Sequence, residues 1–229
     1  MRRRLATYTC VFMNSADGQK KPSRRVRMAE EMRGLRKSDV LFKSDADWWH
    51  NACLNFNGID ISAYAIGYKQ AADFLVERIS QERRYQDTLV YPIAFLYRQY
   101  LELRLKQLIR IGGVLLEIPL KANNLHHGID KLWKQCRNML ENIHPDENAI
   151  DFDDIEKYIA EFARTDPSST AFRYPADKEG NPSLEGLTHI NLRNLAEAMD
   201  KIAVVLDGAV LEIDVLLQDK YEMESWYKG

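Results

Sequence analysis

Apolar residues recur at helical spacing over most of the chain after residue 60, and no segment alternates apolar and polar residues as a strand does. Positions on one face of a helix are three or four residues apart. The pattern predicts five helices, over 61–83, 92–111, 126–144, 151–165 and 191–223. Because these helices must cover one another's apolar faces, we predict an all-α bundle.

Local signals predict where the second of these helices begins and ends. Pro92 suits a first helical turn, where its missing N–H is tolerated, and Gly112 and Gly113 are typical of a helix end. The expected helix therefore has about twenty residues, because a proline disfavours the interior of a helix and glycine weakens it.

Four charged residues of this helix stand out. Arg98, Glu102 and Lys106 are four residues apart in sequence, which predicts an ordinary ladder of ion pairs along one face. Arg104 falls among aromatic and aliphatic positions, so a buried guanidinium there would need a carboxylate, phosphate or carbonyl partner. We favour a structural pair for Arg104 over a ligand contact, and keep it as a candidate binding residue.

The last helix, 191–223, carries a continuous apolar seam. Its members alternate in steps of three and four: Leu192, Leu195, Met199, Ile202, Leu206, Ala209, Ile213 and Leu216. Such a seam can form a dimer interface or the core stripe of a bundle, and we favour the core because neighbouring helices lie in the same chain. Gly208 interrupts it at a cost of about 1 kcal/mol relative to Ala, which suits close packing or a bend.

A long segment, 165–189, separates the last two helices and is rich in turn residues. Its "KEGNPS" stretch, 178–183, predicts a short hairpin-like tip. Loops of this length in compact domains are usually functional or disordered. Arg173 and Tyr174 lie in it, and with His127 they form a candidate nucleotide-binding set.

Charge divides the chain more sharply than its net charge of −2 suggests. Residues 1–43 carry twelve Lys or Arg against four Asp or Glu, and the remainder is acidic. We predict a basic, flexible arm over 1–43, able to include a short helix, and a helical domain over 44–229. The arm can be read as a phosphate-seeking tail, as a solvated extension, or as sequence upstream of a start at Met28 or Met32.

Several classes of function lack their signals. No run of about eighteen apolar residues predicts a membrane helix, and three widely spaced cysteines predict neither a disulfide framework nor a zinc site. His126 and His127 are adjacent and point about 100° apart on a helix, a poor start for metal binding. The glycine-rich phosphate and dinucleotide motifs are absent. We expect a cytoplasmic protein without a metal or cofactor.

The stretch "RNMLENIHPD" carries the candidate chemistry. Arg137 and His144 are seven residues apart, so both project from nearly the same helix face, about 10 Å apart along its axis. Pro145 should end the helix near His144, where the helix dipole favours a cationic imidazole. An imidazole that moves a proton beside a guanidinium that holds a phosphate suits metal-independent RNA cleavage. The other interpretation is a solvent-facing Arg and an ordinary helix end.

Three segments, "YRQYLELRLKQLI", "HHGIDKLW" and "FRYP", followed by a long C-terminal helix, resemble the HEPN superfamily over about residues 88–222. These are small helical bundles of prokaryotic toxin, phage-defence and nucleotidyltransferase-partner proteins. The resemblance implies an up-and-down bundle of about four helices that forms a homodimer. In catalytic members an Arg and a His form a ribonuclease site across the dimer; Arg137, Asn138 and His144 match that pattern, and Glu102 matches its supporting acid.

The resemblance therefore implies a metal-independent endoribonuclease that acts on RNA in phage or stress defence or in a toxin–antitoxin system. In that role His144 would transfer the proton, Arg137 would hold the phosphate, Asn138 would position it and Glu102 would support Arg137. A non-catalytic interaction module, such as an antitoxin or partner subunit whose acidic body binds a basic protein, is the alternative. A nucleotide-binding bundle is a third hypothesis.

Overall fold

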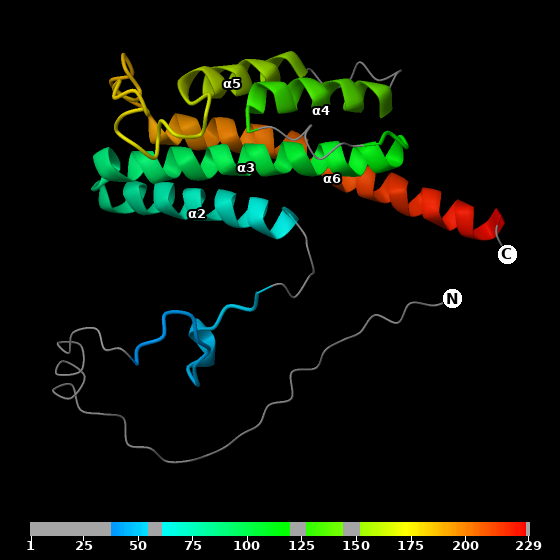
Figure 1. Cartoon of the computed structure of the whole chain (residues 1–229), viewed down its shortest axis with the longest axis horizontal. Coiled ribbons are helices and arrows are strands. Elements are labelled where there is room, and N and C mark those ends of the chain that lie inside the picture. The colour runs from blue at the N-terminus through cyan, green and yellow to red at the C-terminus, as the bar shows by residue number, and fades with distance from the viewer. Residues whose placement is uncertain (1–37, 55–60, 120–126, 144–151, 228–229) are drawn as a thin grey trace. The chain divides into compact units, whose positions relative to one another are not determined.

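The computed structural model describes residues 38–54, 61–119, 127–143 and 152–227 (Figure 1). The chain divides into two compact units, 1–54 and 55–229, which are described separately. Most of the predicted arm, residues 1–37, lies outside the described residues, and so does the predicted site residue His144. No helix among the described residues is long and apolar enough to cross a membrane.

The described part of the first unit contains one short 3-10 helix, η1, Trp48–His50. The Asn51 side chain closes this segment, because its Oδ1 accepts from the Asp45 N–H at 3.0 Å and its Nδ2 donates to the Asp45 carbonyl at 2.7 Å. The Trp48 and Trp49 rings are both largely exposed.

The second unit is all-α, as predicted. Its helices are α2, Ile61–Glu82; α3, Gln86–Leu115; α4, Ile129–Ile143; α5, Phe152–Thr165; and α6, Leu192–Tyr227. The central helix, α3, packs against α2, α4 and α6, while α5 packs against α4. Figure 1 shows α2 on one side of α3 and α4 with α5 on the other. The shared core includes Tyr97, Leu101 and Leu105 of α3, all fully buried.

The predicted start and end of the second helix were wrong. The helix begins at Gln86 and ends at Leu115, so Pro92 and both glycines lie inside it. Leu89 before the proline and Ile93 after it both pack on the core, and this burial on each side outweighs the hydrogen bond that Pro92 cannot donate. The helix stops instead where the Leu116 and Ile118 N–H groups bond back to the Gly112 and Gly113 carbonyls.

Gly112 serves helix packing rather than helix termination. A Cβ atom at this position would lie 2.4 Å from the Met139 Sδ atom of α4, whereas one at Gly67 of α2 would meet nothing within 4 Å. The missing side chain thus lets α3 and α4 approach closely.

Alanine substitutions at Gly67 and Gly112 should have opposite effects on stability. Gly67→Ala should raise the free energy of unfolding by about 0.5–1 kcal/mol, because alanine favours a helix. Gly112→Ala should instead lower it by about 1 kcal/mol, because displacing buried Met139 costs more than the helix preference gains. Urea unfolding of both variants measures the difference, and equal stabilisation by the two would refute this role of Gly112.

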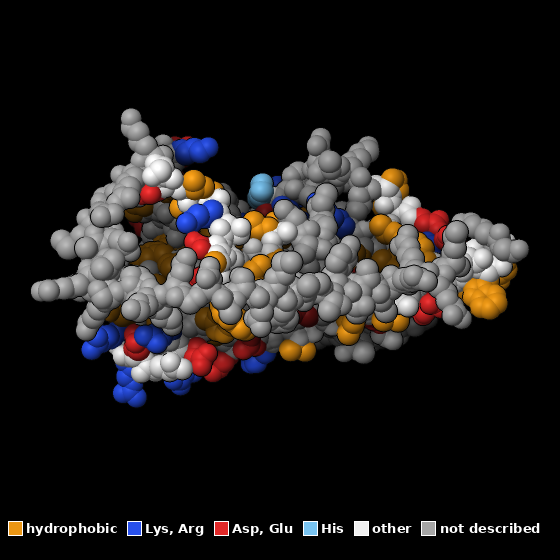
Figure 2. All heavy atoms as spheres, turned by 90° about the horizontal axis from the view of Figure 1, so that it is seen from below, with side chains coloured by type: hydrophobic (Ala, Val, Ile, Leu, Met, Phe, Trp, Pro, Cys, Tyr) orange, Lys and Arg blue, Asp and Glu red, His pale blue; other side chains and the backbone are white. Residues whose placement is uncertain are grey.

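The apolar seam of α6 faces the core of its own chain, as we favoured. Five residues of the predicted seam are buried, Met199, Ile202, Leu206, Ala209 and Ile213, together with Ala203, Val210 and Leu217. The other three seam residues, Leu192, Leu195 and Leu216, are half-buried. A second face remains exposed, with Val204, Leu211 and Val215 on it and Gly208 between them. Apart from the neighbouring backbone of α6 itself, a Cβ atom at Gly208 would meet no described atom within 4 Å, so the close packing that was one of the two expectations for this glycine does not occur among the described residues. Figure 2 shows hydrophobic side chains among charged ones on the face seen from below in Figure 1.

The segment between α5 and α6 contains the predicted hairpin-like tip. Ala176 and Pro182 form an isolated antiparallel bridge. Asp177 closes the turn, because its N–H donates to the Asn181 carbonyl at 2.9 Å and its Oδ1 accepts from the Asn181 N–H at 2.8 Å. Gly180 supplies the positive φ, 88°, that this turn requires.

Candidate functional site

Arg137, the predicted phosphate-holding residue, is bound by three carboxylates. Its Nε lies 2.8 Å from Glu141 Oε1, and its Nη1 lies 2.8 Å from Asp153 Oδ1 and 2.6 Å from Glu156 Oε2. These contacts tie α4 to α5. Because three negative charges surround one positive charge, the local field opposes a phosphate at this guanidinium.

The other residues predicted beside Arg137 do not complete a site among the described residues. The Asn138 side chain accepts a hydrogen bond from Asn142 Nδ2 at 3.0 Å. His144 lies outside the described residues. Glu102 lies on α3, and no hydrogen bond joins it to Arg137 in the part of the chain that the structure describes.

Glu102 is instead the centre of a second cluster, which we call the Glu102 cluster: Arg98, Glu102, Lys106, His127 and Asp166. Glu102 is buried, with 3% of the residue exposed. Its Oε2 accepts from Arg98 Nη1 at 3.0 Å, and its Oε1 lies 2.8 Å from both Lys106 Nζ and His127 Nδ1. The predicted ion-pair ladder is therefore present, but it is buried and includes a histidine from outside the helix.

Arg98 holds two distant segments against α3. This fully buried guanidinium donates from Nη2 to the His127 carbonyl at 2.9 Å and from Nε to the Asp166 carbonyl at 3.0 Å. The segment before α4 and the segment after α5 are thereby fixed to one point on the central helix. Asp166 continues the connection, because its Oδ1 accepts from the Thr170 and Ala171 N–H groups at 2.7 and 3.0 Å.

His127 is the part of the Glu102 cluster that solvent reaches. Its side chain is 79% exposed, although Nδ1 is held at the buried carboxylate. When Nδ1 carries the proton and donates it to Glu102, the other ring nitrogen, Nε2, can accept a proton from a bound molecule. A carboxylate that orients a histidine in this way is a recurring arrangement in acid–base catalysis.

Opposing effects act on the pKa of Glu102. Burial raises this pKa, but hydrogen bonds from Lys106, His127 and Arg98 and the charge of Lys106 outweigh the burial, so the pKa lies below its usual value. The ionised carboxylate thus stabilises the folded state above the unfolded-state pKa of about 4.3, and this contribution is lost as the pH falls through the lower folded-state pKa.

Because Glu102 stabilises the folded state only while it is ionised, stability should depend on pH through this residue. Between pH 5 and pH 3 the wild-type protein should lose more of its free energy of unfolding than a Glu102→Gln variant, which has no carboxylate to protonate. Urea unfolding at stepped pH measures both slopes. Parallel slopes would show that Glu102 does not contribute to the pH dependence.

Arg173 and Tyr174, two of the predicted binding residues, pack together on the α3 surface. The Arg173 guanidinium lies 5.4 Å from the centre of the Phe95 ring and 5.5 Å from that of Tyr174. Its Nε donates to the Ser169 carbonyl at 2.6 Å. Phe95 and Glu102 share a face of α3 about 10 Å apart along the axis. Arg173, which contacts Phe95, and His127, which contacts Glu102, therefore lie along the same side of α3. Among the described residues, no hydrogen bond joins the two.

Arg104 has the carboxylate partner that its position required. Its Nε lies 2.8 Å from Asp207 Oδ1 of α6 as an ion pair, and its Nη1 donates to Gln107 Oε1 at 2.6 Å. The Tyr100 hydroxyl donates to the same Asp207 oxygen at 2.8 Å. These contacts link α3 to α6 and leave Arg104 3% exposed. Arg104 therefore has a structural role in the packing of α3 on α6.

Comparison of the chain with family models, with curated proteins and with solved structures finds no match. Among the described residues, no group of three or more His, Cys, Asp or Glu could hold a metal ion. Sequence reasoning missed Arg98, Lys106 and Asp166 as members of the site. A signal for Arg98 existed, since it lies one helical turn before Glu102 and beside buried Tyr97, but its burial depends on two segments that are distant in sequence.

Proposed function

We propose that the protein is a metal-independent endoribonuclease in which His127 transfers the proton. The single observation that carries the proposal is the solvent-exposed His127 imidazole, whose Nδ1 lies 2.8 Å from a buried carboxylate that also holds Lys106. The HEPN resemblance supports RNA as the substrate and connects the activity with phage or stress defence. This site replaces the predicted pair of Arg137 and His144, because the charge of Arg137 is already neutralised by three carboxylates.

In the proposed reaction the adjacent 2′-hydroxyl of the RNA cleaves the strand. His127 Nε2 would take the proton of that hydroxyl, whose oxygen then bonds to phosphorus. The bond from phosphorus to the 5′ oxygen breaks, this oxygen takes up a proton from solvent, and the His127 imidazolium releases its proton to solvent. Lys106 would offset the negative charge that develops on the phosphate, and Glu102 would hold the imidazole and balance its positive charge. The products are a 2′,3′-cyclic phosphate and a 5′-hydroxyl.

The proposal is tested with one RNA oligonucleotide and a second copy that carries a 2′-deoxy sugar at the cleaved position. In EDTA, the protein should cut the RNA into fragments with cyclic phosphate ends and leave the deoxy position intact. Cleavage at the deoxy position, or loss of all cleavage in EDTA, would overturn this chemistry. A folded protein that cuts no RNA would favour the non-catalytic interaction module.

The exposed face of α6 supports a second copy of the chain as partner. Val204, Gly208, Leu211 and Val215 are spaced by four, three and four residues, the spacing of a helix-pairing face. We expect Leu211→Glu to reduce the molar mass measured by light scattering from that of a dimer to that of a monomer. A wild-type protein that is already monomeric at micromolar concentration would contradict the homodimer.

A further inference from the structure

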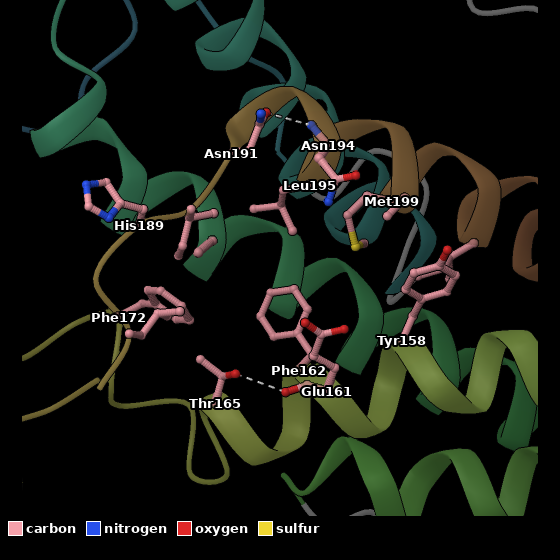
Figure 3. A pocket seen from close by; sticks show the side chains of 15 residues that line it. Tyr158, Glu161, Phe162, Thr165, Phe172, His189, Asn191, Asn194, Leu195 and Met199 are labelled. Carbon is pink, nitrogen blue, oxygen red and sulfur yellow. Dashed lines mark hydrogen bonds between the residues drawn. The ribbon is translucent and has the colours of Figure 1, made fainter. Parts of the chain in front are cut away.

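A pocket of about 250 Å³ lies where α5 and the start of α6 meet α3, apart from the Glu102 cluster. Figure 3 shows that side chains from α5, from α6 and from the segment before α6 point toward one common space. The apolar part of its lining is formed mainly by Ala94, Phe162, Phe172, Leu195, Met199 and Ile202. The Phe162 and Phe172 rings meet edge to face with their centres 6.3 Å apart.

Polar groups around this pocket can accept hydrogen bonds. Tyr158, Glu161, His189 and Asn194 are among the residues that line it. The Glu161 carboxylate forms no hydrogen bond or ion pair with any other described residue. No Lys or Arg belongs to the lining, so the pocket carries negative charge and does not favour a phosphate.

We propose that this pocket binds a flat nitrogen heterocycle of nucleobase size that carries an amino group. Pockets for drug-sized ligands enclose about 300–1,000 Å³, so this one suits a smaller molecule. The phenylalanine rings and the Met199 thioether offer faces and edges to an aromatic ring. The Glu161 carboxylate accepts the N–H of the amino group, which gives the site its preference among heterocycles.

This inference goes beyond RNA cleavage and does not depend on it. None of Arg98, Glu102, Lys106 and His127 lines the pocket. A His127→Gln variant should therefore bind the heterocycle as the wild type does, whatever its effect on RNA.

The test compares two nucleosides by calorimetry: adenosine, and nebularine, which is adenosine without the amino group. Adenosine should bind saturably and about tenfold or more tightly than nebularine, because a hydrogen bond to a charged group is lost with the amino group. Glu161→Ala should remove this difference. Glu197→Ala, which removes an exposed carboxylate of α6 that does not line the pocket, should preserve it.

A second variant tests the location. Asn194 is exposed on the rim, so Asn194→Trp should fill the mouth of the pocket without disturbing the core and should abolish the binding of both nucleosides. Thermal unfolding confirms that each variant is folded. The proposal is overturned if adenosine does not bind saturably, if both nucleosides bind the wild type equally, or if folded Asn194→Trp binds adenosine unchanged.

Discussion

Replacing Arg98 by methionine is expected to lower the free energy of unfolding by about 3–5 kcal/mol, the usual cost of removing one partner from a buried ion pair. Arg98 is fully buried and contacts Glu102, the His127 carbonyl and the Asp166 carbonyl at 2.9–3.0 Å. Methionine fills similar space but donates no hydrogen bond. The variant leaves the buried Glu102 and Asp166 without their shared cation and frees two segments from α3.

Urea unfolding measures this loss, and Arg110→Met is its control. Arg110 is an exposed arginine on the same helix, so its replacement should change stability by no more than about 0.5 kcal/mol. In the double variant Arg98→Met/Glu102→Gln, part of the loss should be recovered, because the buried carboxylate whose Oε2 has lost its Arg98 donor is replaced by a neutral amide. Equal effects of Arg98→Met and Arg110→Met would contradict a structural role for the Glu102 cluster.

Replacing His127 by glutamine should reduce the rate of RNA cleavage by about 10²–10⁴-fold, the usual contribution of a positioned acid–base group. Glutamine can still donate a hydrogen bond to Glu102 but cannot accept and release a proton at neutral pH. Because the His127 side chain is largely exposed, its loss should leave the protein folded. Single-turnover cleavage in EDTA, with urea unfolding alongside, separates the loss of chemistry from a loss of structure.

His50→Gln is the matched control for this variant. His50 is an exposed histidine whose Nδ1 also lies 2.8 Å from a carboxylate, that of Asp47, but Asp47 is itself exposed. Its replacement should leave the cleavage rate unchanged. If both variants cleave as the wild type does, His127 is not the reacting group.

The sequence predicted the helices well because each is long and strongly periodic. It failed at Pro92 and Gly112, where local preference and tertiary packing conflict. Pro92 disfavours the interior of a helix, but core contacts on both sides keep it there. Gly112 resembles a helix end by composition, although α4 requires a residue without a side chain at this point.

The candidate site was less predictable, because it depends on which distant segments meet. The four-residue spacing of Arg98 and Glu102 predicted their contact, but their burial comes from His127 and Asp166, 29 and 68 residues after Arg98. The same limit applies to Arg137, since two of its three carboxylates belong to α5. Spacing within one helix indicates neighbours on that helix, whereas the contacts between helices require the fold.

The deciding experiment for His127 as the reacting group measures RNA cleavage in EDTA by four folded proteins: the wild type, His127→Gln, His144→Ala and Arg137→Ala. We expect the wild type to cleave the RNA and His127→Gln alone to lose the activity. If His144→Ala and Arg137→Ala lose the activity while His127→Gln keeps it, the reaction belongs to the "RNMLENIH" stretch and the assignment of the Glu102 cluster as the active site is contradicted.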